Sequence, residues 1–147
     1  MDGTTRLSRD GEPVFHYSFL STFAEACVVP DASCVPIGDD DPLDVASIVG
    51  CAVTTGIGAV WRTGDVRPGD RTAVFGCGGV GLSAVIGARA AGAECVIAVD
   101  VSQAKLDDAL DCGATHTVQW QGDPESTADA VLAIVGGGVD CAVEATG

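Results

Sequence analysis

Residues 71–100 read RTAVFGCGGVGLSAVIGARAAGAECVIAVD, which predicts a strand, a tight glycine turn, a helix and a second strand ending in an acid. Gly76 permits the tight turn, Gly78 lets backbone approach a pyrophosphate without an intervening Cβ, and Gly81 lets the helix pack close to the sheet. The free N–H groups and partial positive charge of the helix N-terminus face the phosphates in such units. The stretch therefore predicts a dinucleotide-binding βαβ unit.

The acid at the end of the second strand indicates which dinucleotide the unit prefers. Asp100 follows the apolar run 95–99, where its carboxylate can accept hydrogen bonds from an adenosine ribose. The same negative charge repels a 2′-phosphate, so the pattern favours NAD over NADP. The alternative is a tight strand–helix turn with no ligand. It is disfavoured because the strand, the helix and the terminal acid are all present.

The composition is that of a globular protein and not of a disordered one. Hydrophobic residues make up 47% of the 147 residues and charged residues 19%. The formal net charge of −14 argues against nucleic acid as a partner, because its phosphates would be repelled. It argues equally against an anionic membrane surface. We attribute the acidity to solubility.

Cysteine usage and the ends of the chain point to the cytoplasm. The seven cysteines contain no C-x-x-C pair and, being odd in number, make no tidy disulfide framework. This pattern fits a reducing compartment. Residues 1–12 are polar and charged, so no signal peptide is expected there. Glycines and charged residues interrupt the uncharged stretches before they reach the length of a membrane span, and we expect a soluble cytoplasmic protein.

The region before the glycine turn predicts irregular β structure and then helix. Residues 22–29 and 34–37 predict strands. Asp41-Pro42 predicts a helix start, with Asp as N-cap and Pro at the first helical position. Residues 43–63 are helical in composition but contain several glycines, so we expect two short helices that meet near Gly50-Cys51.

The region after Asp100 continues the alternation of strands and helices. We expect a helix from Ser102 to Cys112, a strand at 115–118, a helix opened by Asp123-Pro124 and a last strand at 139–146. This order predicts an α/β fold with a parallel sheet of about four strands. A complete doubly wound domain has six strands, so we expect the chain to be a piece of a longer protein.

Three blocks of sequence carry a resemblance to a known family. The blocks are Ser21-Thr22-Phe23-Ala24-Glu25, Gly50-Cys51-Ala52-Val53-Thr54-Thr55-Gly56 and Gly76-Cys77-Gly78-Gly79-Val80-Gly81-Leu82-Ser83. They resemble the medium-chain, zinc-dependent alcohol dehydrogenase family, and the resemblance runs from about Phe15 to Gly147. It implies that residues 1–48 are the C-terminal part of a GroES-like catalytic domain. Residues 49–147 then form an NAD-binding Rossmann domain, truncated at its C-terminus.

The resemblance also implies roles for single residues. Cys51 matches a ligand of the catalytic zinc, Thr55 a threonine beside the nicotinamide, and Val80 the residue packed against that ring. Tyr17 is a loose match to a residue of the alcohol pocket. With Cys51 as the metal ligand, the expected cofactor-binding residues are Thr55, Gly76, Gly78, Gly79, Val80, Gly81, Asp100, Val101, Lys105, Ala145 and Thr146.

The implied function is hydride transfer between an alcohol, or an aldehyde adduct, and NAD at a zinc ion that lowers the pKa of the bound alcohol. The family's other zinc ligands, its proton relay and its structural zinc lobe have no counterpart in these residues. We therefore expect this chain alone to be inactive and assign it no catalytic residue. The resemblance implies a small alcohol or aldehyde as substrate and a homodimeric or homotetrameric parent.

Two other interpretations stay open. The first is a zinc-free quinone or enoyl reductase of the same superfamily, which usually prefers NADPH and which Asp100 disfavours. The second is a nucleotide-binding module without catalysis. His16 and His116 have no carboxylate or second ligand at a useful spacing, so neither is assigned a chemical role.

Overall fold

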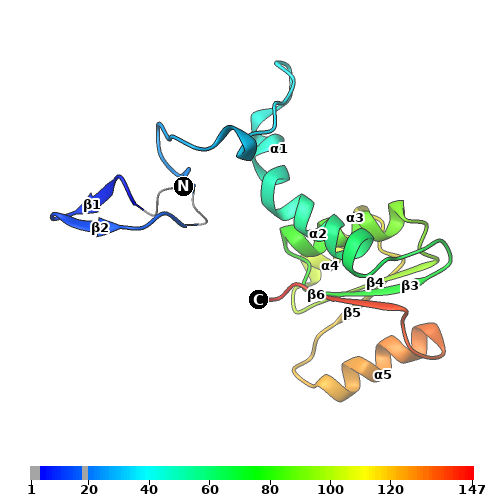
Figure 1. Cartoon of the computed structure of the whole chain (residues 1–147). Coiled ribbons are helices and arrows are strands. Elements are labelled where there is room, and N and C mark those ends of the chain that lie inside the picture. Colours follow the sequence, from blue (N-terminus) through cyan, green and yellow to red (C-terminus); the bar gives the residue numbers. More distant parts are fainter. Residues whose placement is uncertain (1–3, 18–19) are drawn as a thin grey trace. The chain divides into compact units, whose positions relative to one another are not determined.

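The fold is described from a computed structural model, in which residues 4–17 and 20–147 are described. Their contacts divide the chain into two compact units, Met1–Asp40 and Asp41–Gly147, each considered by itself (Figure 1). The second unit holds the whole of residues 71–100, the stretch that the sequence predicts to bind a dinucleotide. The expected boundary between a catalytic-domain part, residues 1–48, and an NAD-binding domain, residues 49–147, is a functional division and stays a prediction.

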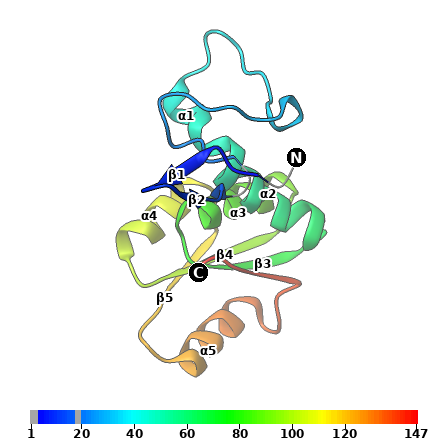
Figure 2. The same ribbon diagram turned by 60° about the vertical axis from the view of Figure 1, so that its left-hand side comes forward.

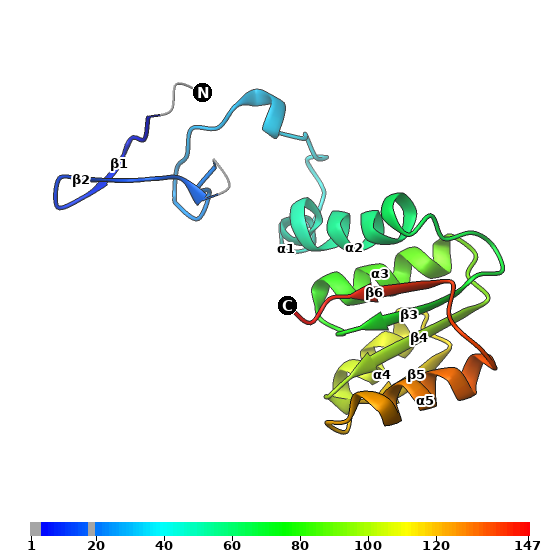
Figure 3. The same cartoon turned by 60° about the horizontal axis from the view of Figure 1, so that its bottom comes forward.

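The second unit is built on a four-stranded parallel sheet, which confirms the predicted α/β class. Its strands are β3 (Arg71–Phe75), β4 (Cys95–Asp100), β5 (His116–Gln119) and β6 (Cys141–Glu144). Their order in the sheet is β5-β4-β3-β6 (Figure 3). The chain thus moves outward from β3 to β5 and then returns to place β6 on the other side of β3. The carboxyl ends of β3 and β6 meet at this change of direction, where open α/β sheets bind their ligands.

Helices cover both faces of this sheet. α3 (Gly79–Ala90) and α4 (Gln103–Asp111) lie on one face, and α5 (Pro124–Val135) lies on the other (Figures 1 and 2). The predicted start of α5 is confirmed, because the Asp123 carboxylate accepts a backbone hydrogen bond there. Gly136 ends the helix with a φ of 65°, a conformation that glycine adopts without strain.

Alternate residues of β4 enter two hydrophobic cores. Val96 and Ala98 are fully buried in the core that also contains Leu106 of α4. Ile97 is fully buried in the core on the opposite face, to which α5 contributes Val131. Burial on both faces explains why the strand is a continuous apolar run and does not alternate with polar residues.

A single long helix precedes β3, and the expected break near Gly50-Cys51 is wrong. A glycine inside a helix costs only about 1 kcal/mol relative to alanine, so Gly50 weakens the helix without ending it. Two stretches of this helix have wider, π-helical turns, which are often found at functional sites. The segments of helix Leu43–Thr63 are α1 (Leu43–Ile48), a π turn (Val49–Val53), α2 (Thr54–Gly58) and a second π turn (Ala59–Thr63).

One glycine of this helix, Gly56, is explained by the packing of the helix on α3. Gly56 is buried, and a Cβ there would overlap the carbonyl oxygen of Val80 and lie 2.6 Å from the Cβ of Ser83. On the other side of the contact, a Cβ on Gly87 would lie 3.2 Å from the Cα of Ile57. The two helices therefore meet backbone to backbone along this line.

Helix Leu43–Thr63 is, among the described residues, the one helix long and apolar enough to cross a membrane by length and composition alone. Our expectation that no stretch reaches that length is therefore wrong. Core helices of soluble proteins pass the same test but are mostly buried, whereas only 11% of the apolar window of this helix is buried, although Val60 itself is fully buried. The helix is weak evidence for a membrane.

The first unit contains a short hairpin, β1 (Leu7–Arg9) and β2 (Glu12–Val14), which the sequence analysis missed (Figure 2). Asp10 and Gly11 form its two-residue turn with φ values of 54° and 86°, as hairpin turns of this length require. The strands expected at 22–29 and 34–37 are wrong, because these segments pair with no other strand among the described residues. Apolar composition alone does not make a strand without a hydrogen-bonding neighbour.

The two leucines of α4 test how far the core stabilises the second unit. Leu106 is 1% exposed and Leu110 is 45% exposed. We expect Leu106→Ala to lower the free energy of unfolding by about 2–5 kcal/mol, the range for deleting a buried leucine side chain. Leu110→Ala on the same helix is the matched control and is expected to cost much less. Urea unfolding followed by circular dichroism measures both, and equal losses would contradict the assignment of the core.

Candidate functional site

A cavity of about 610 Å³ lies at the carboxyl ends of the parallel strands, at the change in strand order. A cavity of this size suits a cofactor or a part of one. The structure brings seven of the predicted cofactor-binding residues together in its wall. They are Gly76, Gly78, Asp100, Val101, Lys105, Ala145 and Thr146.

The glycine turn is shaped by close backbone contacts. Gly76 has a φ of 89°, and a Cβ there would lie 2.7 Å from the carbonyl oxygen of Ala145, at the end of β6. A Cβ on Gly81 would overlap the carbonyl oxygen of Gly76. Gly78 differs from both, because a Cβ there would meet nothing within 4 Å. Two glycines therefore hold the turn against the sheet, while the third leaves open space beside the cavity.

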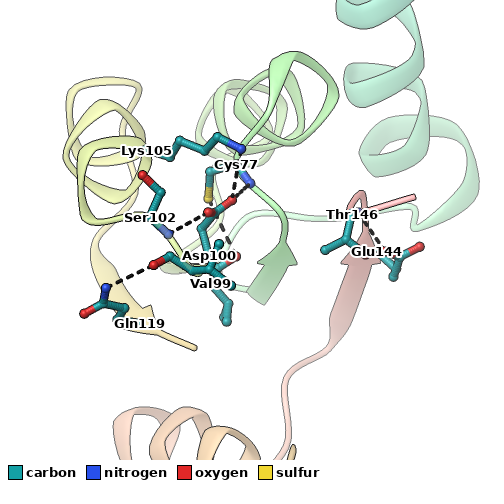
Figure 4. A network of polar contacts seen from close by, with 9 residues as sticks. Cys77, Val99, Asp100, Ser102, Lys105, Gln119, Glu144 and Thr146 are labelled. Carbon is teal, nitrogen blue, oxygen red and sulfur yellow. Dashed lines mark hydrogen bonds and ion pairs between the residues drawn. The ribbon is translucent and has the colours of Figure 1, made fainter. Parts of the chain in front are cut away.

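The Asp100 carboxylate connects β4 to the glycine turn. One oxygen, Oδ2, accepts the backbone N–H of Cys77 at 2.8 Å (Figure 4). The other, Oδ1, accepts the backbone N–H of Ser102 at 2.9 Å. The Lys105 ammonium from α4 lies 3.9 Å from Oδ2. Asp100 is thus held in one orientation at the cavity wall, although only 8% of its surface is exposed.

These donors keep Asp100 charged. Burial alone would raise the pKa of Asp100, but the N–H groups of Cys77 and Ser102 and the charge of Lys105 outweigh it and lower the pKa below its usual value. A carboxylate with a lowered pKa stabilises the folded state at pH values above its unfolded pKa. That contribution is lost only as the pH falls through the lower, folded value. The negative charge is therefore present in the cavity at neutral pH.

The rim formed by β6 is also ordered by a carboxylate. Glu144 accepts the backbone N–H of Thr146 at 2.7 Å and the hydroxyl of the same residue (Figure 4). The hydroxyl and backbone hydrogen bonds from Thr146 lower the pKa of Glu144. Both side chains are exposed, so this pair forms a polar edge at the mouth of the cavity.

Four residues of the cavity wall were missed by the sequence analysis, namely Phe75, Val99, Trp120 and Glu144. Trp120 is the largest of them, and its backbone N–H donates to the carbonyl oxygen of Asp100 at 2.9 Å. Its position in the sequence could have indicated this place, because Trp120 directly follows β5 and the carboxyl ends of parallel strands share one edge of the sheet. An aromatic residue at that edge suits a flat, apolar ligand group.

The thiol of Cys77 is buried and does not line the cavity. Burial, reinforced by the charge of Asp100, raises the pKa of Cys77 to about 11. Its sulfur lies 3.8 Å from the carbonyl oxygen of Val99. The residue acts through its backbone N–H toward Asp100, and its side chain fills the core as a small apolar group.

The remaining predicted residues lie outside the lining of the cavity. Gly79, Val80 and Gly81 form the first turn of α3, where free N–H groups are available to a phosphate. Cys51 and Thr55 lie on helix Leu43–Thr63, and both are exposed. Their roles toward zinc and nicotinamide stay predictions.

The described residues do not fit a zinc ion by themselves. Within 4–17 and 20–147, no group of three or more His, Cys, Asp or Glu side chains is placed to hold a metal ion. A structural or catalytic zinc site takes at least three such ligands. Cys51 offers one thiolate only.

Known proteins resemble this chain over almost its whole length. S-(hydroxymethyl)glutathione dehydrogenase from Saccharomyces cerevisiae is 41% identical over 99% of this chain, and alcohol dehydrogenase class-3 from Pisum sativum is 38% identical over 99%. The alignments cover 39% of each relative, so the chain spans about two fifths of the length of these relatives. Residues 79–147 also match the family described as zinc-binding dehydrogenase.

Solved structures give the same result. The alcohol dehydrogenase zinc-binding domain protein from Burkholderia ambifaria matches with a TM-score of 0.83 and 40% identity, over 93% of this chain and 37% of that one. Benzyl alcohol dehydrogenase from Acinetobacter calcoaceticus matches with a TM-score of 0.80 and 34% identity, over 87% of this chain and 35% of that one. The sequence blocks, the sheet order and these matches agree, and together they support the medium-chain, zinc-dependent alcohol dehydrogenase family for this chain.

Proposed function

We propose that this chain supplies the NAD-binding part of an oxidoreductase that transfers a hydride between an alcohol, or an aldehyde adduct, and NAD. The observation that carries the proposal is the cavity at the change in strand order, with a charged, oriented Asp100 in its wall. The names of the relatives, which are dehydrogenases of alcohols and of S-(hydroxymethyl)glutathione, support the substrate class.

The residues of the cavity fit a dinucleotide. Gly78 leaves open backbone for the pyrophosphate, and the first turn of α3 offers N–H groups and a partial positive charge to it. Asp100 accepts hydrogen bonds from a ribose diol, using lone pairs that its two backbone donors leave free. When bound, NAD supplies the hydride acceptor, while these residues bind and orient it.

The charges of the cavity favour NAD over NADP. A 2′-phosphate would bring a second negative group close to the nearly buried carboxylate of Asp100. Lys105 is the nearby cation, but its ammonium lies 3.9 Å from that carboxylate and the side chain is about half exposed, so it compensates poorly. This argument disfavours the zinc-free, NADPH-preferring reductases of the same superfamily.

For the whole protein we propose a zinc requirement with Cys51 as one ligand. Since the described residues of this chain offer no complete ligand set, we derive no catalytic step from the metal and propose that this chain alone is inactive. A nucleotide-binding module without catalysis is the alternative for the chain as it stands. The further proposals are a cytoplasmic location, a homodimeric or homotetrameric whole protein and no nucleic-acid or membrane partner.

The first test is cofactor discrimination at Asp100. Asp100→Ser removes two charge-assisted hydrogen bonds to the ribose, each worth about 1.5–3 kcal/mol, and removes the repulsion toward a 2′-phosphate. The ratio of the dissociation constants for NAD and NADP should therefore shift by about tenfold or more toward NADP, since about 1.4 kcal/mol is a factor of ten. Calorimetric titration measures all four constants. Asp108→Ser, an exposed acid on α4, is the control. An unchanged ratio in Asp100→Ser would place the ribose elsewhere.

The second test uses the two tryptophans of the chain. Trp120 lines the cavity and Trp61 does not. NAD bound in the cavity should quench the fluorescence of Trp120, so the quenching should persist in Trp61→Phe and disappear in Trp120→Phe. Fluorescence titration of the two variants measures this. Quenching that survives in Trp120→Phe would locate the nucleotide outside the cavity.

The third test is the zinc content of this chain. Because Cys51 stands without a complete ligand set, we expect far less than one zinc ion per chain after purification with zinc and desalting. Cys51→Ser should leave that content unchanged. Elemental analysis by mass spectrometry measures both. One zinc ion per chain, lost in Cys51→Ser, would show that the chain completes the site by other means.

A further inference from the structure

The turn between β4 and α4, residues 100–102, is held by the neighbouring strand β5. The side-chain amide nitrogen Nε2 of Gln119, the last residue of β5, donates to the carbonyl oxygen of Val101 at 3.0 Å (Figure 4). The backbone N–H of Trp120, the next residue, donates to the carbonyl oxygen of Asp100 at 2.9 Å. The end of β5 therefore fixes two consecutive carbonyl groups of this turn.

The Gln119 bond acts on the peptide unit that faces the Asp100 carboxylate. The carbonyl group of Val101 and the N–H group of Ser102 belong to one planar trans peptide unit, so they point in opposite directions. Gln119 holds the carbonyl end of that unit, and Oδ1 of Asp100 accepts the N–H end at 2.9 Å. A flip of the unit would break both bonds together. The Gln119 amide thus keeps the Ser102 N–H directed at Asp100.

The other groups that hold the Asp100 carboxylate do not come from β5. The backbone N–H of Cys77, in the glycine turn, donates to the second oxygen, Oδ2, at 2.8 Å. The ammonium of Lys105, from α4, lies 3.9 Å from the same oxygen. Loss of the Gln119 amide should therefore loosen the carboxylate at Oδ1 and leave Oδ2 held. This asymmetry separates a local effect at Ser102 from a general loss of stability.

We propose that Gln119 is a positioning residue of the dinucleotide site, which acts through the Val101–Ser102 peptide unit to orient Asp100. The proposal rests on the proposed function, because the ribose of NAD is the expected ligand of Asp100. A carboxylate that is already oriented loses less conformational freedom when it accepts the ribose hydroxyls, so binding is tighter. Gln119 lies outside the lining of the cavity, and its effect on a ligand is therefore indirect.

The first arm of the test uses no nucleotide and measures amide hydrogen exchange in the 147-residue chain by NMR spectroscopy. Gln119→Met keeps an unbranched side chain at an exposed position and removes the donor. We expect the Ser102 amide to exchange about three- to tenfold faster, as for the loss of one neutral hydrogen bond. The Cys77 amide, which donates to the other oxygen of Asp100, should keep its rate and is the internal reference.

The second arm connects this orientation to binding, by calorimetric titration of the same chain with NAD. Gln119→Met should raise the dissociation constant of NAD about three- to tenfold. In the Asp100→Ser background it should have no further effect, because the residue acts through Asp100. Gln103→Met is the matched control, since Gln103 is also exposed and its amide donates to Asp107 on the same helix. It should leave the dissociation constant unchanged.

The two arms separate this proposal from the proposed function. An unchanged Ser102 exchange rate in Gln119→Met, or equal rises at Ser102 and Cys77, would overturn the role of Gln119. Equal weakening of NAD binding by Gln119→Met with and without Asp100→Ser would overturn it too. NAD binding that Asp100→Ser leaves unchanged would instead contradict the proposed function. The exchange rates, measured without nucleotide, then still decide whether Gln119 orients Asp100. Circular dichroism checks that each variant is folded.

Discussion

A buried carboxylate that accepts two backbone N–H groups organises the cavity at the carboxyl ends of the parallel strands. Asp100 joins the end of β4 to the glycine turn through Cys77 and to the start of α4 through Ser102. A nearly buried charge is stable only where its hydrogen bonds are satisfied, and these two donors come from the segments that must be aligned for a dinucleotide. The same group that would bind the ribose therefore also assembles the cavity around it.

Much of the second unit follows from the sequence because local and long-range signals agree there. The glycines at 76, 78 and 81 predict a turn that only a strand and a helix can flank, and the acid at 100 marks the next strand end. The caps at Asp123 and Gly136 likewise predict α5 closely. Seven predicted residues meet in one cavity because parallel strands end at one edge of the sheet.

The parts that could not be predicted depend on neighbours that a single sequence does not display. Gly50 and Gly56 suggest a helix break when taken alone, yet Gly56 is needed for contact with α3 and Gly50 is tolerated in a π turn. Residues 22–29 have the composition of a strand but pair with no other strand among the described residues. The place of Trp120 in the cavity wall depends on strand order, which residue spacing along the chain does not reveal.

The contact between helix Leu43–Thr63 and α3 has a consequence for how this protein can change over time. Because backbone atoms meet at Gly56 and Gly87, the separation of the two helices is set by the main chain and not by side chains that can repack. A larger residue at Gly56 has no rotamer that relieves the overlap with Val80, so either this helix or the start of α3, with the free N–H groups of its first turn, must move. Substitution along this helix contact is thereby restricted to the smallest side chains.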